Sequence, residues 1–229
     1  MAKKVVKKTK IKVFNLFLVL FVLIGLFFGG KIIYEAPIKN YIITGTTYLK
    51  DDYILELGNL KNYPKFLFLN REQVSKKITK SEYIEDCKIK KKWGFILELD
   101  ITENRPLIYD MNQEKYVLEH NRVVEKNEIS KSFRVPRLLN YVPDTKFEKF
   151  VKGMTNVKQD TLSKISDIEY QPNDYDKDRF LLYMDDGNMV YLTLTKFKMI
   201  NQYNNVLSQL EGHKGILYLD SGNHFQIKE

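Results

Sequence analysis

A long uncharged segment near the N-terminus constrains this chain more than any other feature. Residues 13–30 read VFNLFLVLFVLIGLFFGG, and Ile32 and Ile33 extend the apolar run beyond Lys31. A helix rises about 1.5 Å per residue, so a run of this length covers about 27 Å, close to the roughly 30 Å hydrocarbon core of a bilayer. The sequence therefore predicts a transmembrane helix over residues 13–33.

The charges that flank this segment predict its orientation. The segment is preceded by six lysines and no acid: Lys3, Lys4, Lys7, Lys8, Lys10 and Lys12. Because positive flanks stay in the cytoplasm, residues 1–12 are predicted to be a cytoplasmic basic tail, with the rest of the chain outside the membrane. Subtracting these six charges from the formal net charge of +8 leaves +2, so the basic balance gives little support for nucleic-acid binding by the body.

A cleaved signal peptide is the main alternative to a retained anchor. Its apolar region is usually about 7–15 residues long and ends in small residues spaced as A-x-A. The run here is longer, and the stretch LFFGGKIIYEAP, which begins within its last five residues, offers a poor cleavage site. A retained, single-pass anchor is therefore favoured.

The outer part begins with a region in which the segments follow the order β, α, α, β, β. Residues 41–45 read as a short strand, two helices follow around residues 49–57 and 71–78, and Asn70 with Gln73 resembles a capping box. Two strands come next. The second alternates Phe95, Leu97, Leu99 and Ile101 with polar residues. Residues 34–106 are therefore predicted to form one compact α+β domain.

Residues 107–229 are predicted to form a second, strand-rich domain. Two short strands surround His120, a connector follows at residues 135–143, and a short helix is expected within residues 144–163. The best hairpin runs from Arg179 to Thr195 around an Asp-Asp-Gly-Asn turn, and residues 196–210 read as an amphipathic helix before a final hairpin. The predicted fold class is α+β, with a mostly antiparallel β domain.

The sequence contains no recognisable catalytic or metal-binding motif. It has no nucleophile elbow, phosphate loop or dinucleotide fingerprint, and its histidines (His120, His213 and His224) are scattered near turns, as solvated side chains usually are. Four acids are spaced loosely like a Ca²⁺ loop, but Arg179 replaces the turn glycine; they are Asp174, Asp176, Asp178 and Asp185. Cys87 is the single cysteine, which excludes an internal disulfide and favours a buried thiol in a strand. We predict no catalytic residue, metal, cofactor or small-molecule substrate.

The segment DITENRPLIYD, residues 100–110, carries an acid and a base where a strand should end. Glu103 and Arg105 are two residues apart, so on a strand they share a face. One carboxylate without a second acid or a nucleophile is thin evidence for catalysis. Pro106 has no N–H to donate and would interrupt the ladder. We interpret Glu103, Arg105 and Pro106 as a structural clamp at the end of the first domain.

The order and spacing of several segments resemble the DivIB/FtsQ family of bacterial division proteins. The resemblance runs from the anchor nearly to the C-terminus, and its departures include Thr46, Cys87, Gly94 and Asn121. The segments that carry it are YIITGTTYLKDDYI, FLFLNREQVSKKI, YIEDCKIKKKWGFILELDITENRPLIY, KYVLEHNRVV, VPRLLNY, ISDIEY and DDGNMVYL.

The resemblance implies a POTRA domain followed by a β domain, both outside the membrane, and no enzyme activity. It also implies a scaffold at the division septum that binds membrane proteins of the FtsL and FtsB/DivIC type and helps to organise septal peptidoglycan synthesis. In this family the partner's strand pairs with an edge strand near the end of the β domain, and edge strands offer unpaired backbone groups for such pairing. The candidate partner-binding residues are Ile216, Leu217, Tyr218, Leu219, Asp220, Phe225 and Ile227.

Two other functions share some of these features. An anchored extracytoplasmic cell-wall enzyme would need Glu103, Asp185 and a histidine to meet in one cleft. A POTRA-type sensor or assembly factor would share the fold without the septal location.

Overall fold

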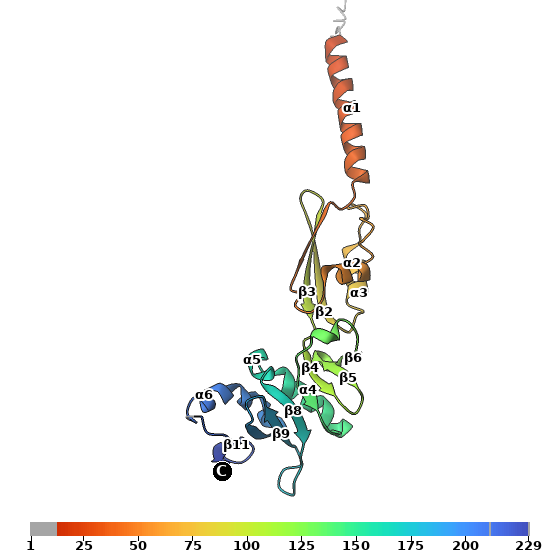
Figure 1. Ribbon diagram of the computed structural model, residues 1–229. Coiled ribbons are helices and arrows are strands. Elements are labelled where there is room, and N and C mark those ends of the chain that lie inside the picture. The colour runs from red at the N-terminus through yellow and green to blue at the C-terminus, as the bar shows by residue number, and fades with distance from the viewer. Residues whose placement is uncertain (1–12, 211, 229) are drawn as a thin grey trace, which may run out of the picture.

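The computed structural model describes residues 13–210 and 212–228, and its three parts follow one another along the chain (Figure 1). The predicted basic tail, residues 1–12, lies outside the described residues. The first part is helix α1, Val13–Glu35, which extends two residues beyond the predicted span. Its residues Phe14–Glu35 are long and apolar enough to cross a membrane, and none of this segment is buried against the rest of the protein.

The second part is the predicted βααββ unit. It consists of β1 (Asn40–Thr44), α2 (Asp51–Leu57), α3 (Arg71–Ile78), β2 (Ile84–Lys92) and β3 (Ile96–Glu103). The sheet order is β1-β3-β2, with β1 and β3 parallel because the two helices connect β1 to the rest of the sheet, and β2 and β3 antiparallel.

The predicted sequence patterns account for the core of this unit. The inward-facing residues of β3 (Leu97, Leu99 and Ile101) are buried against both helices. Asn70 begins α3 as expected, since its side chain accepts a hydrogen bond of 3.2 Å from the Gln73 N–H. Cys87 is buried on β2, and burial raises the pKa of its thiol to about 11, so the thiol is protonated at neutral pH.

Gly45 connects β1 to the loop before α2, and no other residue type fits its position. Its φ of +84° lies in the left-handed region, and a Cβ there would come within 2.0 Å of the Ile101 carbonyl oxygen. The turn can therefore pass directly over β3.

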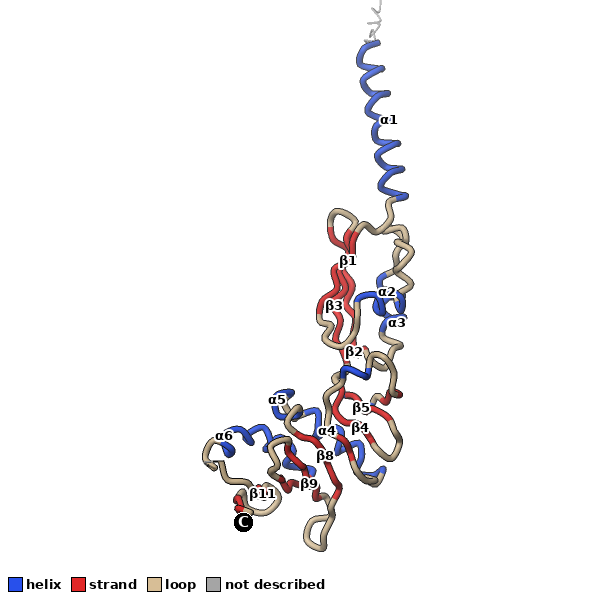
Figure 2. Tube along the Cα trace, in the orientation of Figure 1, coloured by secondary structure: helices blue, strands red, loops and turns tan. Residues whose placement is uncertain are grey.

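The third part is built on a nine-stranded sheet in the order β12-β11-β10-β9-β8-β7-β4-β5-β6. Strands of this sheet are drawn in red in the lower part of Figure 2. The pairs β4–β7, β7–β8 and β10–β11 are parallel, and the other pairs are antiparallel. The strands are β4 (Pro106–Asp110), β5 (Lys115–Leu118), β6 (Val123–Glu125), β7 (Arg137–Leu138), β8 (Ile165–Tyr170), β9 (Arg179–Met184), β10 (Met189–Thr193), β11 (Gly215–Tyr218) and β12 (His224–Ile227).

Helices packed against this sheet close its core. They are α4 (Asp144–Thr155), α5 (Gln159–Leu162), the 3₁₀ helix η3 (Leu194–Gln202) and α6 (Tyr203–Leu207); two further single 3₁₀ turns are η1 (Glu119–Asn121) and η2 (Ser130–Ser132). Phe150 of α4 stacks on Phe180 of β9 with ring centroids 4.8 Å apart, and Phe197 of η3 meets both rings edge-on. A Cβ on Gly153 would lie 3.1 Å from the Phe197 ring, so this glycine lets α4 and η3 approach closely.

Two predicted segments differ from the structure. The amphipathic helix expected over residues 196–210 begins at Leu194 and is 3₁₀ as far as Gln202, and only Tyr203–Leu207 are α-helical. Its apolar side still faces the core through Phe197, Ile200 and Tyr203.

The connector predicted at residues 135–143 contains the strand β7, which pairs with β4 on one side and β8 on the other. Two residues are too few for alternation to be visible in a sequence, and flanking prolines hide them further.

Candidate functional site

The last strand of the chain forms one edge of the large sheet. β12 pairs with β11, and within the described residues no strand pairs with its other side. β11 is an inner strand, because it pairs with β10 as well as β12. The free backbone groups of this end of the sheet therefore belong to β12.

The predicted partner-binding residues divide between these two strands. Five of them lie in or just after β11, where Leu217 and Leu219 are buried and the N–H groups of Leu219 and Asp220 donate to the Tyr191 carbonyl. Asp220 is bound by Arg179, whose Nε donates to its Oδ2 at 2.7 Å. Only Phe225 and Ile227 belong to the edge strand β12, where an incoming strand could reach them. The other five predicted residues lie in or just after β11 and support the edge strand from behind.

The hydrogen-bond alternation of an antiparallel pair identifies which amides of β12 face outward. The Lys228 N–H donates to the Lys214 carbonyl across the pair at 2.9 Å. Because inward-facing amides alternate along a strand, those of Gln226 and His224 also point toward β11, and those of Ile227 and Phe225 point away from it. A partner strand could pair with these outward amides.

The two faces of this edge offer different chemistry. On the core face, Phe225 borders a hollow of about 330 Å³ between β11, β12 and the helices, lined also by Met199, Val206 and Leu210. On the opposite face, Tyr218 stacks between Tyr191 (5.4 Å) and His224 (4.6 Å). No sequence pattern indicated that His224 and Tyr191 would flank Tyr218, because their proximity depends on strand pairing.

A buried hydrogen-bond network fixes the start of β11. The Asn188 side chain donates to the Tyr203 hydroxyl at 2.9 Å and accepts from the Gly215 N–H at 2.8 Å. The Tyr203 hydroxyl donates in turn to Asp186 Oδ2 at 2.8 Å. Burial is the larger cause, and the Asp186 carboxylate the next, of a raised pKa for the Tyr203 hydroxyl. The hydroxyl therefore stays protonated and remains a donor. The hairpin turn, η3–α6 and β11 are thus held as one unit behind the edge.

The second candidate site is the junction where β3 passes into β4. Arg105 lies between these strands and binds only the β domain: Nε donates to Glu119 at 3.1 Å, Nη1 to the Val157 carbonyl and Nη2 to the Thr155 carbonyl, each at 2.9 Å. Both charged side chains are about one-fifth exposed. The guanidinium therefore joins the start of β4, η1 and the end of α4.

Glu103 binds the first domain instead. Its carboxylate accepts hydrogen bonds of 2.9–3.2 Å from the backbone N–H groups of Thr47, Tyr48 and Leu49, which precede α2. Glu103 and Arg105 thus bind different partners on the two sides of the junction. Pro106 is buried and is the first residue of β4 rather than the end of a strand. The proposed clamp role of these three residues stays a prediction.

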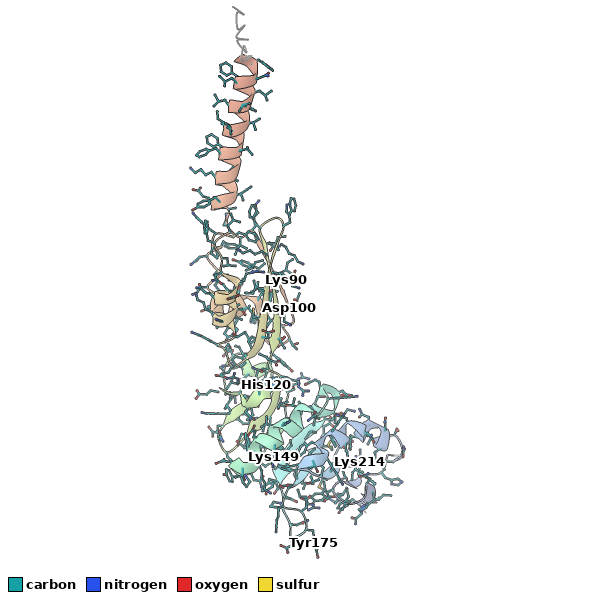
Figure 3. The ribbon with its side chains drawn as sticks, turned by 180° about the vertical axis from the view of Figure 1, so that it is seen from behind. Lys90, Asp100, His120, Lys149, Tyr175 and Lys214 are labelled. Atoms are coloured by element: carbon teal, nitrogen blue, oxygen red, sulfur yellow. The ribbon has the colours of Figure 1, made fainter. Side chains whose placement is uncertain are left out.

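Further polar contacts join the two domains around Asn104 and Asn127. The Asn104 amide donates to the Glu82 carbonyl and its carbonyl oxygen lies 2.9 Å from His120 Nδ1, while Asn127 donates to the Tyr83 hydroxyl at 2.7 Å. His120 lies between the two folded units in Figure 3. Phe133 adds an aromatic contact, because its ring packs edge-on against Tyr48, Tyr83 and Tyr116.

The Glu103→Gln substitution tests how firmly this carboxylate holds the loop before α2. A neutral amide has one acceptor oxygen, so we expect the three N–H groups to lose part of their binding and the chain to lose about 1–2 kcal/mol of unfolding free energy. Amide hydrogen exchange at Thr47–Leu49 should accelerate relative to α3. Glu125→Gln, at an exposed glutamate of β6, is the control and should leave these amides unchanged.

The described residues contain no group of three or more His, Cys, Asp and Glu side chains that could hold a metal ion. All three histidines are exposed, as expected. Two of the acids whose spacing loosely matches a Ca²⁺ loop bind protein groups: Asp176 accepts from the Asp178 N–H, and Asp178 pairs with Lys146.

Comparison with known proteins identifies the first domain. A family model described as "POTRA domain, FtsQ-type" matches residues 36–104. A solved structure of the major extracytoplasmic domain of the division protein DivIB from Geobacillus stearothermophilus matches 48% of this chain and 96% of its own, with 23% identity and a TM-score of 0.39. The apolar helix, the POTRA domain and the sheet that follows define a POTRA-type protein with an N-terminal apolar helix and a second, β-rich domain.

Sequence relatives identify the family. The chain is 25% identical over 196 residues to the cell division protein DivIB of Bacillus subtilis (83% of this chain, 74% of that protein). It is 29% identical over 192 residues to DivIB of Brevibacillus brevis (80% of this chain, 72% of that protein). The chain belongs to the DivIB/FtsQ family of cell division proteins, and its role is in cell division.

Proposed function

We propose that this protein is a non-enzymatic, membrane-anchored scaffold of the division complex. Helix α1 crosses the cell membrane once with the N-terminus in the cytoplasm, and residues 34–106 and 107–229 form a POTRA domain and a β domain outside it. The protein gathers at the division septum. Its partners are division membrane proteins of the FtsL and FtsB/DivIC type, which it helps to organise for septal peptidoglycan synthesis.

The observation that carries this proposal is the free edge of the nine-stranded sheet at β12. An edge strand has unpaired N–H and C=O groups, and a strand from another chain can satisfy them. β12 is short and its side chains are mostly exposed, with Ile227 53% exposed, so little of the strand's own surface is committed to the core. Natural proteins commonly cover or charge such an edge, whereas HFQI carries no acid and no lysine.

The support behind β12 fits a docking role as well. β11 is held by strands on both sides and by the Asn188 network, so β12 is presented on a rigid base. A rigid edge binds with a smaller loss of conformational entropy than a loop does. The hollow beside Phe225, which is lined by both apolar and polar side chains, would accept one side chain of the added strand.

The proposal is tested by following the full chain in the cells that make it. A fluorescent fusion is expected to gather at the septum, depletion is expected to block septation, and the solubilised chain is expected to co-purify with single-pass division proteins. A fusion spread evenly around dividing cells, together with normal septation on depletion, would refute the scaffold. If the fusion gathers at the septum but no membrane protein co-purifies with the chain, the proposed binding of division membrane proteins would be refuted.

The arrangement favours this scaffold over an anchored cell-wall enzyme. The Glu103 carboxylate is bound by three backbone amides, and neither Asp185 nor a histidine is among its hydrogen-bond partners. A general acid or base must reach a reacting group, and this carboxylate already has three donors.

A further inference from the structure

The end of the POTRA domain nearest to α1 carries an exposed surface of aromatic and basic side chains. We call it the membrane-proximal rim, formed by the aromatic residues Tyr34, Tyr63, Phe68 and Trp93 with the exposed Lys39 and Lys65 and the half-buried Lys91, whose ammonium group also donates to the Leu67 carbonyl. Tyr34 lies in the last turn of α1, Tyr63 and Phe68 lie in the loop between α2 and α3, and Trp93 lies in the β2–β3 turn. That turn and that loop both reach toward the end of α1 (Figure 1).

The α2–α3 loop is fixed directly to the chain that leaves α1. The Phe66 N–H donates to the Ala36 carbonyl at 3.0 Å, and the Ile38 N–H donates to the Pro64 carbonyl at 3.1 Å. The Phe68 ring packs edge-on against Tyr34, with centroids 4.8 Å apart. Phe68 therefore lies at the level of the last helical turn.

The β2–β3 turn is fixed to the same segment. The Lys39 N–H donates to the Phe95 carbonyl at 2.9 Å, and the Phe95 ring packs against Phe66 at 5.5 Å. Residue 39 follows the end of α1 by four residues, a path of at most about 14 Å even when fully extended. Trp93, two residues before Phe95, is 98% exposed although it is the largest side chain in the chain.

The charge of the rim is positive. Apart from the last turn of α1, which contributes Tyr34 and the acid Glu35, the rim is formed by residues 36–45, 61–71 and 88–95. These segments contain no acid and eight basic residues: Lys39, Lys61, Lys65, Arg71, Lys88, Lys90, Lys91 and Lys92. Lys61, Lys88 and Lys92 are paired with Glu56, Asp86 and Glu98. The ammonium groups of Lys39, Lys65 and Lys91 lie 5.3–5.7 Å from the ring centres of Phe95, Tyr34 and Phe66, so positive charge and aromatic surface are interleaved.

We propose that the membrane-proximal rim binds the anionic phospholipid surface of the bilayer that α1 crosses, with Trp93 at the depth of the headgroups. The proposal rests on the membrane-spanning part of the proposed function. Tryptophan and tyrosine favour this depth because they combine an apolar ring with a polar group. Lysines near the surface are attracted to anionic headgroups, and the attraction falls off within a Debye length.

Binding at this surface orients the rest of the molecule. The POTRA domain is joined to α1 by only Ala36–Lys39 before β1 begins, so a second contact with the bilayer stops rotation about that short link. β12, at the opposite end of the chain's folded part, is then presented at a defined height above the membrane (Figure 1).

The single tryptophan makes the test direct, because Trp93 alone reports the environment of the rim. The full chain is reconstituted into vesicles of phosphatidylcholine alone or mixed with phosphatidylglycerol. With phosphatidylglycerol we expect blue-shifted Trp93 emission, weaker quenching by acrylamide, and quenching by lipids brominated near the headgroup. Raising the salt from about 0.1 M to 1 M shortens the Debye length from about 10 Å to about 3 Å and should reverse much of the effect.

Charge-removal variants separate the rim from general surface charge. Lys39→Gln, Lys65→Gln and Lys91→Gln together are expected to remove the response to phosphatidylglycerol. Lys126→Gln, Lys149→Gln and Lys214→Gln together are the control, since these exposed lysines belong to the β domain; the last two are labelled in Figure 3. The unaltered chain is also compared in vesicles with and without phosphatidylglycerol. This comparison needs no variant, so it tests the proposal even if a variant misfolds.

The outcomes distinguish this proposal from the anchor itself. If the chain resists alkaline extraction but Trp93 is quenched equally in every lipid mixture, the rim does not bind lipid and the proposal is wrong while the anchor stands. If the chain is washed from the vesicles, both the anchor and the rim proposal are wrong.

Discussion

Replacing Ile227 by proline is expected to abolish strand addition at β12 and to lower the affinity for the division partner by about 10- to 100-fold. Proline removes the Ile227 N–H, which points away from β11, and places its ring where the incoming strand would lie. The affinity is measured with the full chain and the partner that co-purifies with it. The fold should persist, because Ile227 is half-exposed and its amide is not used within the β11–β12 ladder.

Ile227→Ala is the matched control for this substitution. It removes most of the same side chain but keeps the N–H, so a backbone-mediated interface should retain most of its affinity. Equal losses in the two variants would mean that the side chain carries the contact. Unchanged binding in the proline variant would exclude β12 as the interface and would favour the Tyr218 and His224 face instead.

Replacing Arg105 by alanine is expected to lower the free energy of unfolding by about 2–4 kcal/mol. The substitution leaves the largely buried Glu119 without its cation, and it leaves the carbonyls of the buried Val157 and the exposed Thr155 without donors. Denaturant unfolding of the full chain in detergent measures the loss. The effect should exceed that of Arg122→Ala, whose exposed pair with Glu82 stabilises the protein by less than about 1 kcal/mol.

Arg105→Lys distinguishes charge from geometry at the same position. An ammonium group keeps the charge beside Glu119 but cannot reach the two carbonyls with a planar fork. We therefore expect lysine to recover less than half of the stability lost in alanine. Full recovery would show that the contacts with α4 contribute little.

Short-range patterns predicted most of the local structure. The alternation of Leu97, Leu99 and Ile101 located β3 and its buried face, and Asn70 located the start of α3. The Asp-Gly-containing turn at residues 185–188 located the hairpin of β9 and β10. In each case the signal lies within a few residues of the element it describes, because periodicity and capping are local properties.

The sequence could not predict the features that depend on strand order. β11 pairs with β10 in parallel across an intervening helical segment, so nothing near Ile216–Tyr218 reveals that both of their sides are occupied. Two of the three acceptors of Arg105 are backbone carbonyls about fifty residues away. A main-chain carbonyl has no sequence signature, so the sequence did not reveal that Glu103 and Arg105 bind two separate sets of partners.

The two-residue strand β7 has a mechanical consequence for the large sheet. It is the only strand between β8 and β4, and each of its pairings spans two residues, Arg137 and Leu138. Within the sheet, the strands from β8 to β12 and those from β4 to β6 are therefore joined along a narrow seam, reinforced by the Arg137–Asp167 ion pair. Helix α4 bridges the same seam, because Phe150 stacks on β9 while Arg105 ties the end of α4 to the start of β4. A tension applied at β12 by a bound partner would therefore reach the membrane anchor through α4 and Arg105 as well as through β7.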